Sequence, residues 1–471
     1  MTKRLDPSSQ MMLLMDRPSQ PMHAGGIQMF RLPSNAPRNF VPALVEKLRA
    51  IPPRAPFDQI VAGTLLNHWK KVSVNMKHHV RHVRLPQPGS VEQLMEWAQG
   101  LYSSPLNRSL PLWEMWVLEG IEGNRFAIAI KAHHALVDGQ GGMKLFMGAF
   151  ATKASDRRIL AFWGDNPKEH RKKPAAAKSA GASKRTAPAS RLSITDWIKN
   201  AQALWPLQGR PTRLNGIPQS VERRFGFCNL PLPTMKEISR RHGVTINDVI
   251  VTLVDHATHR YLAESGTAEK GPLVLLMPVS TRKQGSEGGN QVTGVTATLS
   301  APRAGLIERL QAVHGSLKQS KNAVSMLPKA AQFGYFAMLG MVMPQIARWA
   351  DVVGLPISPF NLLVSNISPP PDAHYVDQPL YLGGAEMEGL YIQPILNVST
   401  LLNVTVAGYN NMLNVGIGSA PGAIDEPMRL GKTMEEALLE LAGRRRPASK
   451  ARKSPAVRKR ARAAKSAEQR V

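Results

Sequence analysis

The stretch RFAIAIKAHHALVDGQGGMKLFMGAF (Arg125–Phe150) contains a strand pattern, a histidine pair and a helix pattern in direct succession. The large side chains of Phe126, Ile128 and Ile130 alternate with mostly small ones, which indicates a β-strand with two different faces. This pattern ends at two adjacent histidines, and an acid–glycine pair and further glycines follow before helical spacing begins near Met143. Because scaffolds often place reactive groups where strands end in loops, we expect the chemistry of this protein here.

The pattern His133-His134-x-x-x-Asp138-Gly139 favours proton transfer over other chemistries that histidines support. A metal site is disfavoured because no other His, Cys or acid cluster supplies a convincing third ligand. A serine hydrolase is disfavoured because the sequence has no GxSxG motif. A neutral imidazole near pH 7 can instead take a proton from an alcohol that attacks an activated carbonyl carbon. On spacing alone, a purely structural histidine pair remains the alternative.

The residues of this motif have different expected tasks. Adjacent strand residues point to opposite faces, so one imidazole can face a substrate tunnel while the other is packed and hydrogen-bonded. Asp138 cannot easily orient His134 from within a tight loop, so we expect a salt bridge from Asp138 to an arginine elsewhere that pins the loop. Gly139 leaves room for a bulky substrate because it has no side chain.

The net charge of +27 is concentrated in two segments. Residues 168–191 contain eight basic residues and one acid, and residues 443–471 contain twelve basic residues and one acid. Both segments are rich in Ala, Pro and Ser and lack aromatic residues, so we expect a disordered linker and a disordered tail. They are either solvated spacers or segments that attract an anionic phospholipid surface. Nucleic acid is disfavoured as a partner, because no aromatic stacking platform accompanies the charge.

Cysteine content and hydropathy favour a cytoplasmic protein that is soluble or peripheral to a membrane. The single cysteine, Cys228, excludes an internal disulfide and is typical of a reducing compartment. The N-terminal sequence MTKRLDPSSQ lacks the apolar core of a signal peptide, and no apolar run reaches the ~18–20 residues that cross a bilayer. The methionine-rich segment 333–343 is expected to form a core helix, with a lipid-facing patch as the alternative.

The pattern of elements predicts two folded units. Residues 1–165 and 192–442 mix strands and helices without strict βαβ alternation, and a basic linker (166–191) separates them before the tail (443–471). The predicted fold class is therefore α/β of the mixed α+β kind, with a mixed sheet and packed helices in the first unit.

Local signals position several of these elements. The segment Trp113–Leu118 is expected to pair with the strand that leads to the histidines, through a turn at residues 119–124. Thr245 is expected to cap a helix whose third position is Asp248. The wholly apolar run 273–277 predicts a strand that is buried on both faces.

Motifs spread over nearly the whole chain resemble those of one enzyme family. The longest is SSPLNRSLPLWEMWVLEGIEGNRFAIAIKAHHALVDGQGG, and SSQMMLLMDRPSQPMHAGG, VRHVRLPQPG, PVSTR, FNLLVSNISPP and LNVTVAGYN also match in the expected order. Up to about residue 442, the sequence resembles the bacterial wax ester synthase/acyl-CoA:diacylglycerol acyltransferase family. That family shares HHxxxDG with chloramphenicol acetyltransferase and with peptide-synthetase condensation domains.

The resemblance implies two lobes, each like a chloramphenicol acetyltransferase subunit, with an active-site tunnel between them. It implies that His134 is the general base and that His133, Asp138 and Gly139 support the site structurally. Arg282 is the expected partner of Asp138 across the lobes.

Further site residues follow from the same resemblance. Asn247, at a helix N-terminus, is expected to position the base or polarise the carbonyl, and Ser365 and Asn366 are expected to line the tunnel. The family's usual NVPGP appears here as Asn366-Ile367-Ser368-Pro369-Pro370, without the glycine. This departure is expected to reshape a loop at the tunnel and so bears on the choice of acceptor.

The implied reaction moves a long-chain acyl group from acyl-CoA to a fatty alcohol or to the hydroxyl of diacylglycerol. It yields a wax ester or triacylglycerol and needs no cofactor, because acyl-CoA is a substrate. The basic linker and tail would hold the enzyme at the inner membrane or at lipid inclusions. Two rivals are a related acyltransferase with another hydroxyl acceptor, such as a polyketide or sugar, and a catalytically silent lipid-surface protein.

Overall fold

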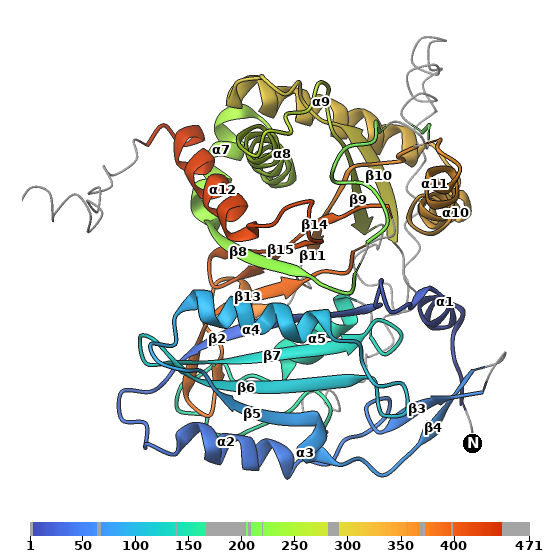
Figure 1. Ribbon diagram of the computed structural model, residues 1–471. Helices are drawn as coiled ribbons and strands as arrows, with labels where there is room; N and C mark the ends of the chain where they lie inside the picture. The colour runs from blue at the N-terminus through green and yellow to red at the C-terminus, as the bar shows by residue number, and fades with distance from the viewer. Residues whose placement is uncertain are drawn as a thin grey trace, which may run out of the picture.

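The computed structural model describes residues 3–63, 67–137, 139–165, 204–205, 209–218, 220–280, 292–355, 357–367, 369, 373–396 and 399–444. Within these residues, two six-stranded sheets and one three-stranded sheet are present, and helices cover the two larger sheets (Figure 1). Both larger sheets contain parallel and antiparallel neighbours. The predicted fold class, a mixed α/β protein, is confirmed.

The first half of the chain builds most of one large sheet and all of the small one. Its strands are β1 (Lys3–Arg4), β2 (His23–Arg31), β3 (Gln59–Ala62), β4 (His68–Lys71), β5 (Val80–Arg84), β6 (Trp113–Ile121) and β7 (Arg125–His133). Its helices are α1 (Pro7–Met15), α2 (Phe40–Arg49), α3 (Met76–His79), α4 (Val91–Ser103) and α5 (Gly139–Gly148). The strand order is β12-β13-β2-β7-β6-β5 in the first large sheet and β1-β4-β3 in the small sheet.

The second half builds the other large sheet, in the order β10-β9-β11-β14-β15-β8. Its strands are β8 (Arg224–Pro231), β9 (Val274–Ser280), β10 (Val292–Thr298), β11 (Leu362–Ile367), β12 (Tyr381–Leu382), β13 (Ala385–Gln393), β14 (Leu402–Tyr409) and β15 (Met412–Ser419). Its helical segments are α7 (Leu232–His242), α8 (Ile246–Glu264), α9 (Leu306–Ser325), α10 (Lys329–Ala337), η1 (Met338–Val342), α11 (Met343–Val352), η2 (His374–Val376) and α12 (Pro427–Leu441).

Strand β7 lies inside the first sheet, between β2 and β6. Its large residues pack in the core that α2 and α5 share, whereas Ala127 and Ala129 lie in the core beneath α4. The alternation in the sequence therefore correctly predicted two different faces, and the predicted β6–β7 hairpin is present. Helix α5 begins at Gly139, earlier than the apolar spacing from Met143 indicated, because its first turn consists of residues that carry no apolar pattern.

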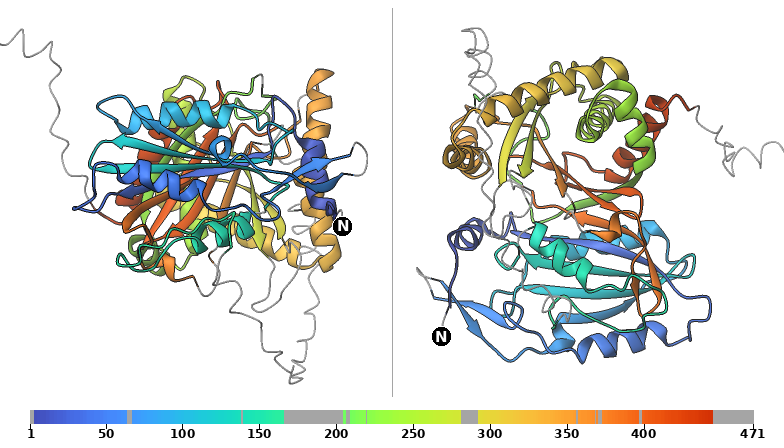
Figure 2. Two further views of the ribbon diagram at one scale, coloured as in Figure 1. Left: turned by 90° about the horizontal axis from the view of Figure 1, so that it is seen from below. Right: turned by 180° about the vertical axis from the view of Figure 1, so that it is seen from behind.

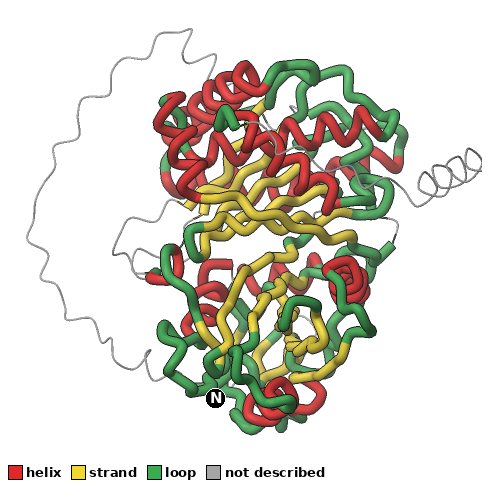
Figure 3. Tube along the Cα trace, turned by 90° about the vertical axis from the view of Figure 1, so that its left-hand side faces the viewer, coloured by secondary structure: helices red, strands yellow, loops and turns green. Residues whose placement is uncertain are grey.

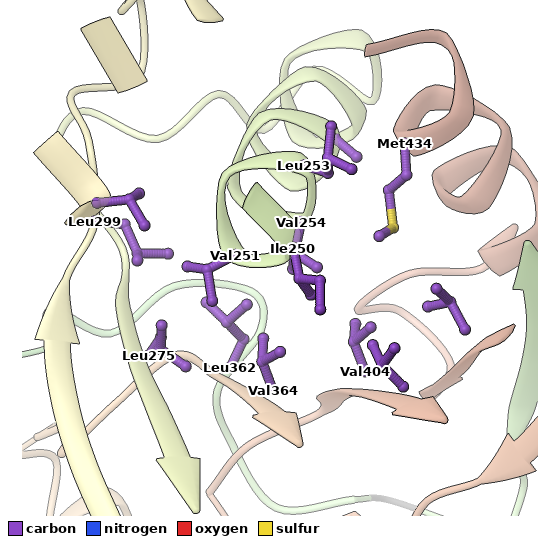
Figure 4. Packing of buried hydrophobic residues seen from close by; sticks show 14 of the residues in the cluster. Ile250, Val251, Leu253, Val254, Leu275, Leu299, Leu362, Val364, Val404 and Met434 are labelled. Carbon is purple, nitrogen blue, oxygen red and sulfur yellow. The ribbon is translucent and has the colours of Figure 1, made fainter. Parts of the chain in front are cut away.

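Helices α7, α8, α9 and α12 cover the outer face of the second sheet, so that helices and strands form separate layers (Figure 3). Figure 4 shows residues of α8, such as Ile250 and Val251, directed at strand residues such as Leu362 and Val404. Strand β9 contributes Leu275 to this core and Leu276 to a smaller one on the opposite face. The prediction that this strand is buried on both faces is confirmed.

Two helices begin with reciprocal capping boxes. The Thr245 hydroxyl accepts the Asp248 N–H at 3.2 Å, and the Asp248 carboxylate accepts the Thr245 N–H at 2.8 Å. The pair Ser90 and Gln93 does the same for α4. The predicted cap at Thr245 is therefore confirmed, and it fixes the orientation of the first turn of α8.

The two sheets are linked by a segment from late in the chain. Strands β12 and β13 follow the second unit's β11 in sequence, yet β13 pairs with β2 of the first sheet (Figure 1). Strand β13 also lies against β14 and β15 of the second sheet. A side chain at Gly416 would overlap the carbonyl oxygen of Ile392, so a glycine is required for this close approach.

The methionine-rich segment 333–343 lies in α10, η1 and the start of α11. Leu339 is fully buried, as expected of a core helix, but Val342 is 49% exposed. The segment therefore contributes both to the core and to the surface. Among the described residues, no helix combines the length and the apolar character that crossing a bilayer requires.

Candidate active site

The two motif histidines lie at and just after the end of β7, and they have different surroundings. His133 is the last residue of the strand, pairs with His23 on β2, and is only 2% exposed. His134 follows the strand and is half-buried, and its backbone N–H donates to the Met22 carbonyl oxygen at 2.9 Å. The strand end is thus held at a defined position relative to β2.

The His133 ring belongs to a polar network behind the strand end. Its Nδ1 accepts the Ala135 N–H at 3.0 Å, so in a neutral ring the proton is on Nε2. That Nε2 lies 3.6 Å from the Asp16 carboxylate, which also accepts hydrogen bonds from Arg108 at 2.7 Å and from the Met22 N–H at 2.8 Å. Sequence reasoning did not single out Asp16 or Arg108, because their contact with His133 is not local in the chain.

The charge of Asp16 is stabilised despite partial burial. Burial alone would raise the pKa of this carboxyl, but the nearby His133 ring and the hydrogen bonds from Met22 and Arg108 outweigh it and hold the pKa well below its usual range. On β2, burial together with the nearby charge of Lys131 lowers the pKa of His23 to about 3. His23 is therefore neutral near pH 7, and its Nε2 donates to the Tyr102 carbonyl oxygen at 3.0 Å.

His134 lines a cavity with an empty volume of about 600 Å³, including its opening to solvent. The wall comes from β2, β7 and α5 of the first half of the chain and from β11 and β13 of the second half. The lining residues are Ala24, Gly25, Gly26, Gln28, Ile130, Ala132, His134, Val137, Gly142, Met143, Phe146, Ile367, Leu390 and Ile392. Among them, only Gln28 and His134 have polar side chains, so the cavity suits an alkyl chain with its reactive group at His134.

Asn247 and Asn366, both singled out from the sequence, lie together behind the cavity wall. The Asn366 side chain donates to the Asn247 Oδ1 at 2.7 Å, which joins β11 to the first turn of α8. Neighbouring Ile367 points to the opposite face of β11 and lines the cavity. Ser365 lies on the same face as Ile367 but is not among the lining residues.

The remaining motif residues are described only in part. Asp138 and Arg282 lie outside the described residues, so the salt bridge expected between them stays a prediction. Gly139 is the first residue of α5.

Sequence reasoning also missed Gln28, Leu390 and Ile392 as lining residues. A lone polar residue in a strand gives no local signal of burial, and no local pattern indicates that β13 pairs with the first sheet.

Comparison with known proteins agrees with this architecture. Residues 5–250 match the family model of the wax ester synthase/diacylglycerol acyltransferase catalytic domain, and residues 288–442 match that of the C-terminal domain of the same family. A probable diacylglycerol O-acyltransferase of Mycobacterium tuberculosis, Tgs4, is 30% identical over 96% of this chain and 100% of its own length. The O-acyltransferase WSD of Acinetobacter baylyi is 29% identical over 92% of this chain and 95% of its own.

Solved structures share the fold. A wax ester synthase/diacylglycerol acyltransferase from Marinobacter aquaeolei superposes with a TM-score of 0.75 at 24% identity, over 94% of this chain and all of that one. The first condensation domain of the calcium-dependent antibiotic synthetase reaches 0.55 at 16% identity, over 94% of this chain and 97% of that one. The family matches cover both halves of the chain, and the chain therefore belongs to the wax ester synthase/diacylglycerol acyltransferase family of O-acyltransferases.

Proposed function

We propose that this enzyme transfers a long-chain acyl group from acyl-CoA to the hydroxyl of a fatty alcohol or of diacylglycerol. The observation that carries the proposal is the His134 side chain at the wall of a cavity that is otherwise almost entirely apolar. Family membership supplies the reaction class, and the lining is consistent with lipid chains as ligands. The products are a wax ester or a triacylglycerol and free CoA, and the reaction needs no cofactor.

His134 acts as the general base in this proposal. Its neutral imidazole takes the proton of the acceptor hydroxyl as the hydroxyl oxygen attacks the thioester carbonyl carbon. The tetrahedral intermediate then expels the CoA thiolate, which takes the proton from the His134 imidazolium. One residue therefore serves both steps, and the ring is neutral again at the end of the cycle.

Other residues position the reacting groups. His133, held by Ala135 and Asp16, supports the strand end that carries His134. Asn247 supports the wall from behind through Asn366, at the positive end of the α8 dipole. Asp138 pairs with Arg282 to brace the loop after His134, and Gly139 leaves room for the chain of the substrate.

The enzyme also binds peripherally to an anionic phospholipid surface in this proposal. Exposed apolar side chains recur along α11 and at the residues that flank it: Ile346 (43%) and Trp349 (71%) lie in the helix, Val342 (49%) directly precedes it and Val353 (67%) directly follows it. Helix α1, which contributes exposed Leu14, lies on the same side of the molecule (Figures 1 and 2). Basic residues of the linker (166–191) and of the tail (443–471) add electrostatic attraction. Nucleic acid is not proposed as a partner.

The test of the reaction is His134→Ala, with palmitoyl-CoA as donor and hexadecanol and dioleoylglycerol offered together as acceptors. We expect turnover, followed by CoA release and by thin-layer analysis of the lipid products, to fall by at least ~100-fold. His82→Ala is the matched control, because this half-exposed histidine pairs with Glu119 away from the cavity. An unchanged rate in His134→Ala would exclude His134 as the base.

The same assay separates the rival functions. Activity of the wild type on polar alcohols alone would indicate a related acyltransferase with another hydroxyl acceptor. Failure of the wild type to release CoA with any acceptor would favour a catalytically silent lipid-surface protein.

A further inference from the structure

Gln28 is a buried amide within the apolar cavity. It lies on β2, is 3% exposed, and is opposite Ile128 on β7 and Leu390 on β13. Gln28 lines the same cavity as His134, and its Oε1 is buried without a hydrogen-bond partner among the described residues. Neither proton transfer at His134 nor packing of an alkyl chain uses this group.

An unpaired amide at this position is costly. Leaving one buried polar group unsatisfied costs about 1–3 kcal/mol, and the large majority of buried polar atoms in proteins have a partner. An apolar side chain would fit the remaining lining better. A hydrogen-bonding group on a bound ligand would offset the cost, whereas a plain methylene chain would not.

The position of Gln28 along the strand indicates where this ligand group lies. Ala24, Gly26 and Gln28 are alternate residues of β2, so they share the face that forms the cavity wall. Ala24 pairs with Ala132 near the strand end that carries His134, and Gln28 is about 13 Å further along, at ~3.3 Å per residue. An extended chain advances ~1.2 Å per bond, so Gln28 would meet a lipid roughly ten to twelve bonds from its reacting end.

We propose that Gln28 selects a lipid chain that carries a hydroxyl group near its middle. A hydroxyl both donates and accepts, and therefore complements the acceptor oxygen and the two donor hydrogens of the amide. The inference rests on the proposed function for the identity of the reacting end. The hydroxylated chain can belong to the acyl-CoA or to the acceptor, and the chemistry at Gln28 is the same in both cases.

The test compares kcat/KM for hydroxylated and plain substrates in the wild type and in Gln28→Met, which keeps the length of the side chain and removes the amide. One arm uses palmitoyl-CoA with or without a hydroxyl between about carbons 9 and 13, together with hexadecanol. The other arm uses palmitoyl-CoA with hexadecanol or with a hexadecanediol whose second hydroxyl is mid-chain. We expect the wild type to prefer the hydroxylated chain at least ~tenfold in one arm, and Gln28→Met to lose this preference.

Met29→Leu is the matched control, because this neighbouring residue packs in the core on the opposite face of β2. It should keep the wild-type preference. Equal preference in the wild type and in Gln28→Met, in both arms, would overturn the proposal. Calorimetric binding of hydroxylated and plain palmitoyl-CoA gives a second readout. If no substrate is turned over, the proposed function fails, whereas a Gln28-dependent binding difference would still support the hydroxyl site.

Discussion

At the scale of single residues, the Asp16 carboxylate beside His133 should make the stability of the protein depend on pH. The pKa of Asp16 is lower in the folded state than in the unfolded state. Its carboxylate therefore contributes its full stabilising free energy at pH values above the unfolded pKa of about 3.9, and this stabilisation is lost as the pH falls towards the folded-state pKa. We expect Asp16→Asn to reduce the free energy of unfolding by about 1–3 kcal/mol at pH 7. The difference from wild type should shrink below about pH 4, as urea unfolding from pH 3 to pH 7 would measure.

Exposed Asp377 provides the control, since Asp377→Asn should change stability little at either pH. A loss in Asp16→Asn that is equally large at pH 3 and pH 7 would contradict the role assigned to its charge.

Residue-level prediction from the sequence succeeded where the signal was local. The alternation in β7 predicted that one histidine would face a cavity and the other the core, and these are the positions of His134 and His133. The contribution of Asp16 was not predictable, because His133 is distant in sequence and only the fold brings them together. Gln28 was not recognised because a single polar residue in a strand is usually solvent-exposed.

At the scale of elements, the first turn of α8 contains both the Thr245 cap and Asn247, so loss of the cap should affect stability and turnover together. Thr245→Ala removes the N-cap and should cost about 1 kcal/mol in urea unfolding. Because Asn247 lies in the same turn and bonds to Asn366 beside the cavity wall, turnover should also fall several-fold in the folded variant. Loss of stability without loss of turnover would show that this turn does not position the site.

Ser90→Ala is the matched control, because Ser90 caps α4 through an equivalent capping box whose two residues, Ser90 and Gln93, are not among the cavity-lining residues. It should cost a similar free energy of unfolding and leave turnover unchanged.

Elements with a capping motif or a continuous apolar run were predicted well. Helix α8 was predicted with its observed cap, and β9 was predicted as a strand that is buried on both faces. Strand β13 was not predicted, since its sequence AEMEGLYIQ contains two acids and a glycine and has no clear alternation. Its burial depends on partners in both sheets, which a local pattern cannot report.

At the scale of the whole molecule, the exposed face of α11 should determine membrane affinity. We expect the triple variant Ile346→Ser/Trp349→Ser/Val353→Ser to bind vesicles of phosphatidylglycerol and phosphatidylcholine at least ~tenfold more weakly than wild type in co-sedimentation. High salt should weaken wild-type binding further, because it screens the basic segments.

Ile307→Ser serves as the control, because Ile307 is 49% exposed, close to the 43% of Ile346, but belongs to a different helix, α9. Unchanged vesicle binding by the triple variant would exclude α11 as the contact. If wild type does not bind vesicles but forms a dimer, and the triple substitution abolishes that dimer, this face is instead a surface for self-association.

The return of β13 to the first sheet also affects how the protein can be divided. Residues 1–165 alone would leave β2 as a bare edge, with unpaired N–H and C=O groups that are open to pairing with other chains. A fragment that starts after the linker would carry β13 with no partner on that side. The first sheet can therefore be completed only after β13 (Ala385–Gln393) has been synthesised, and each half of the chain depends on the other for its full set of strand partners.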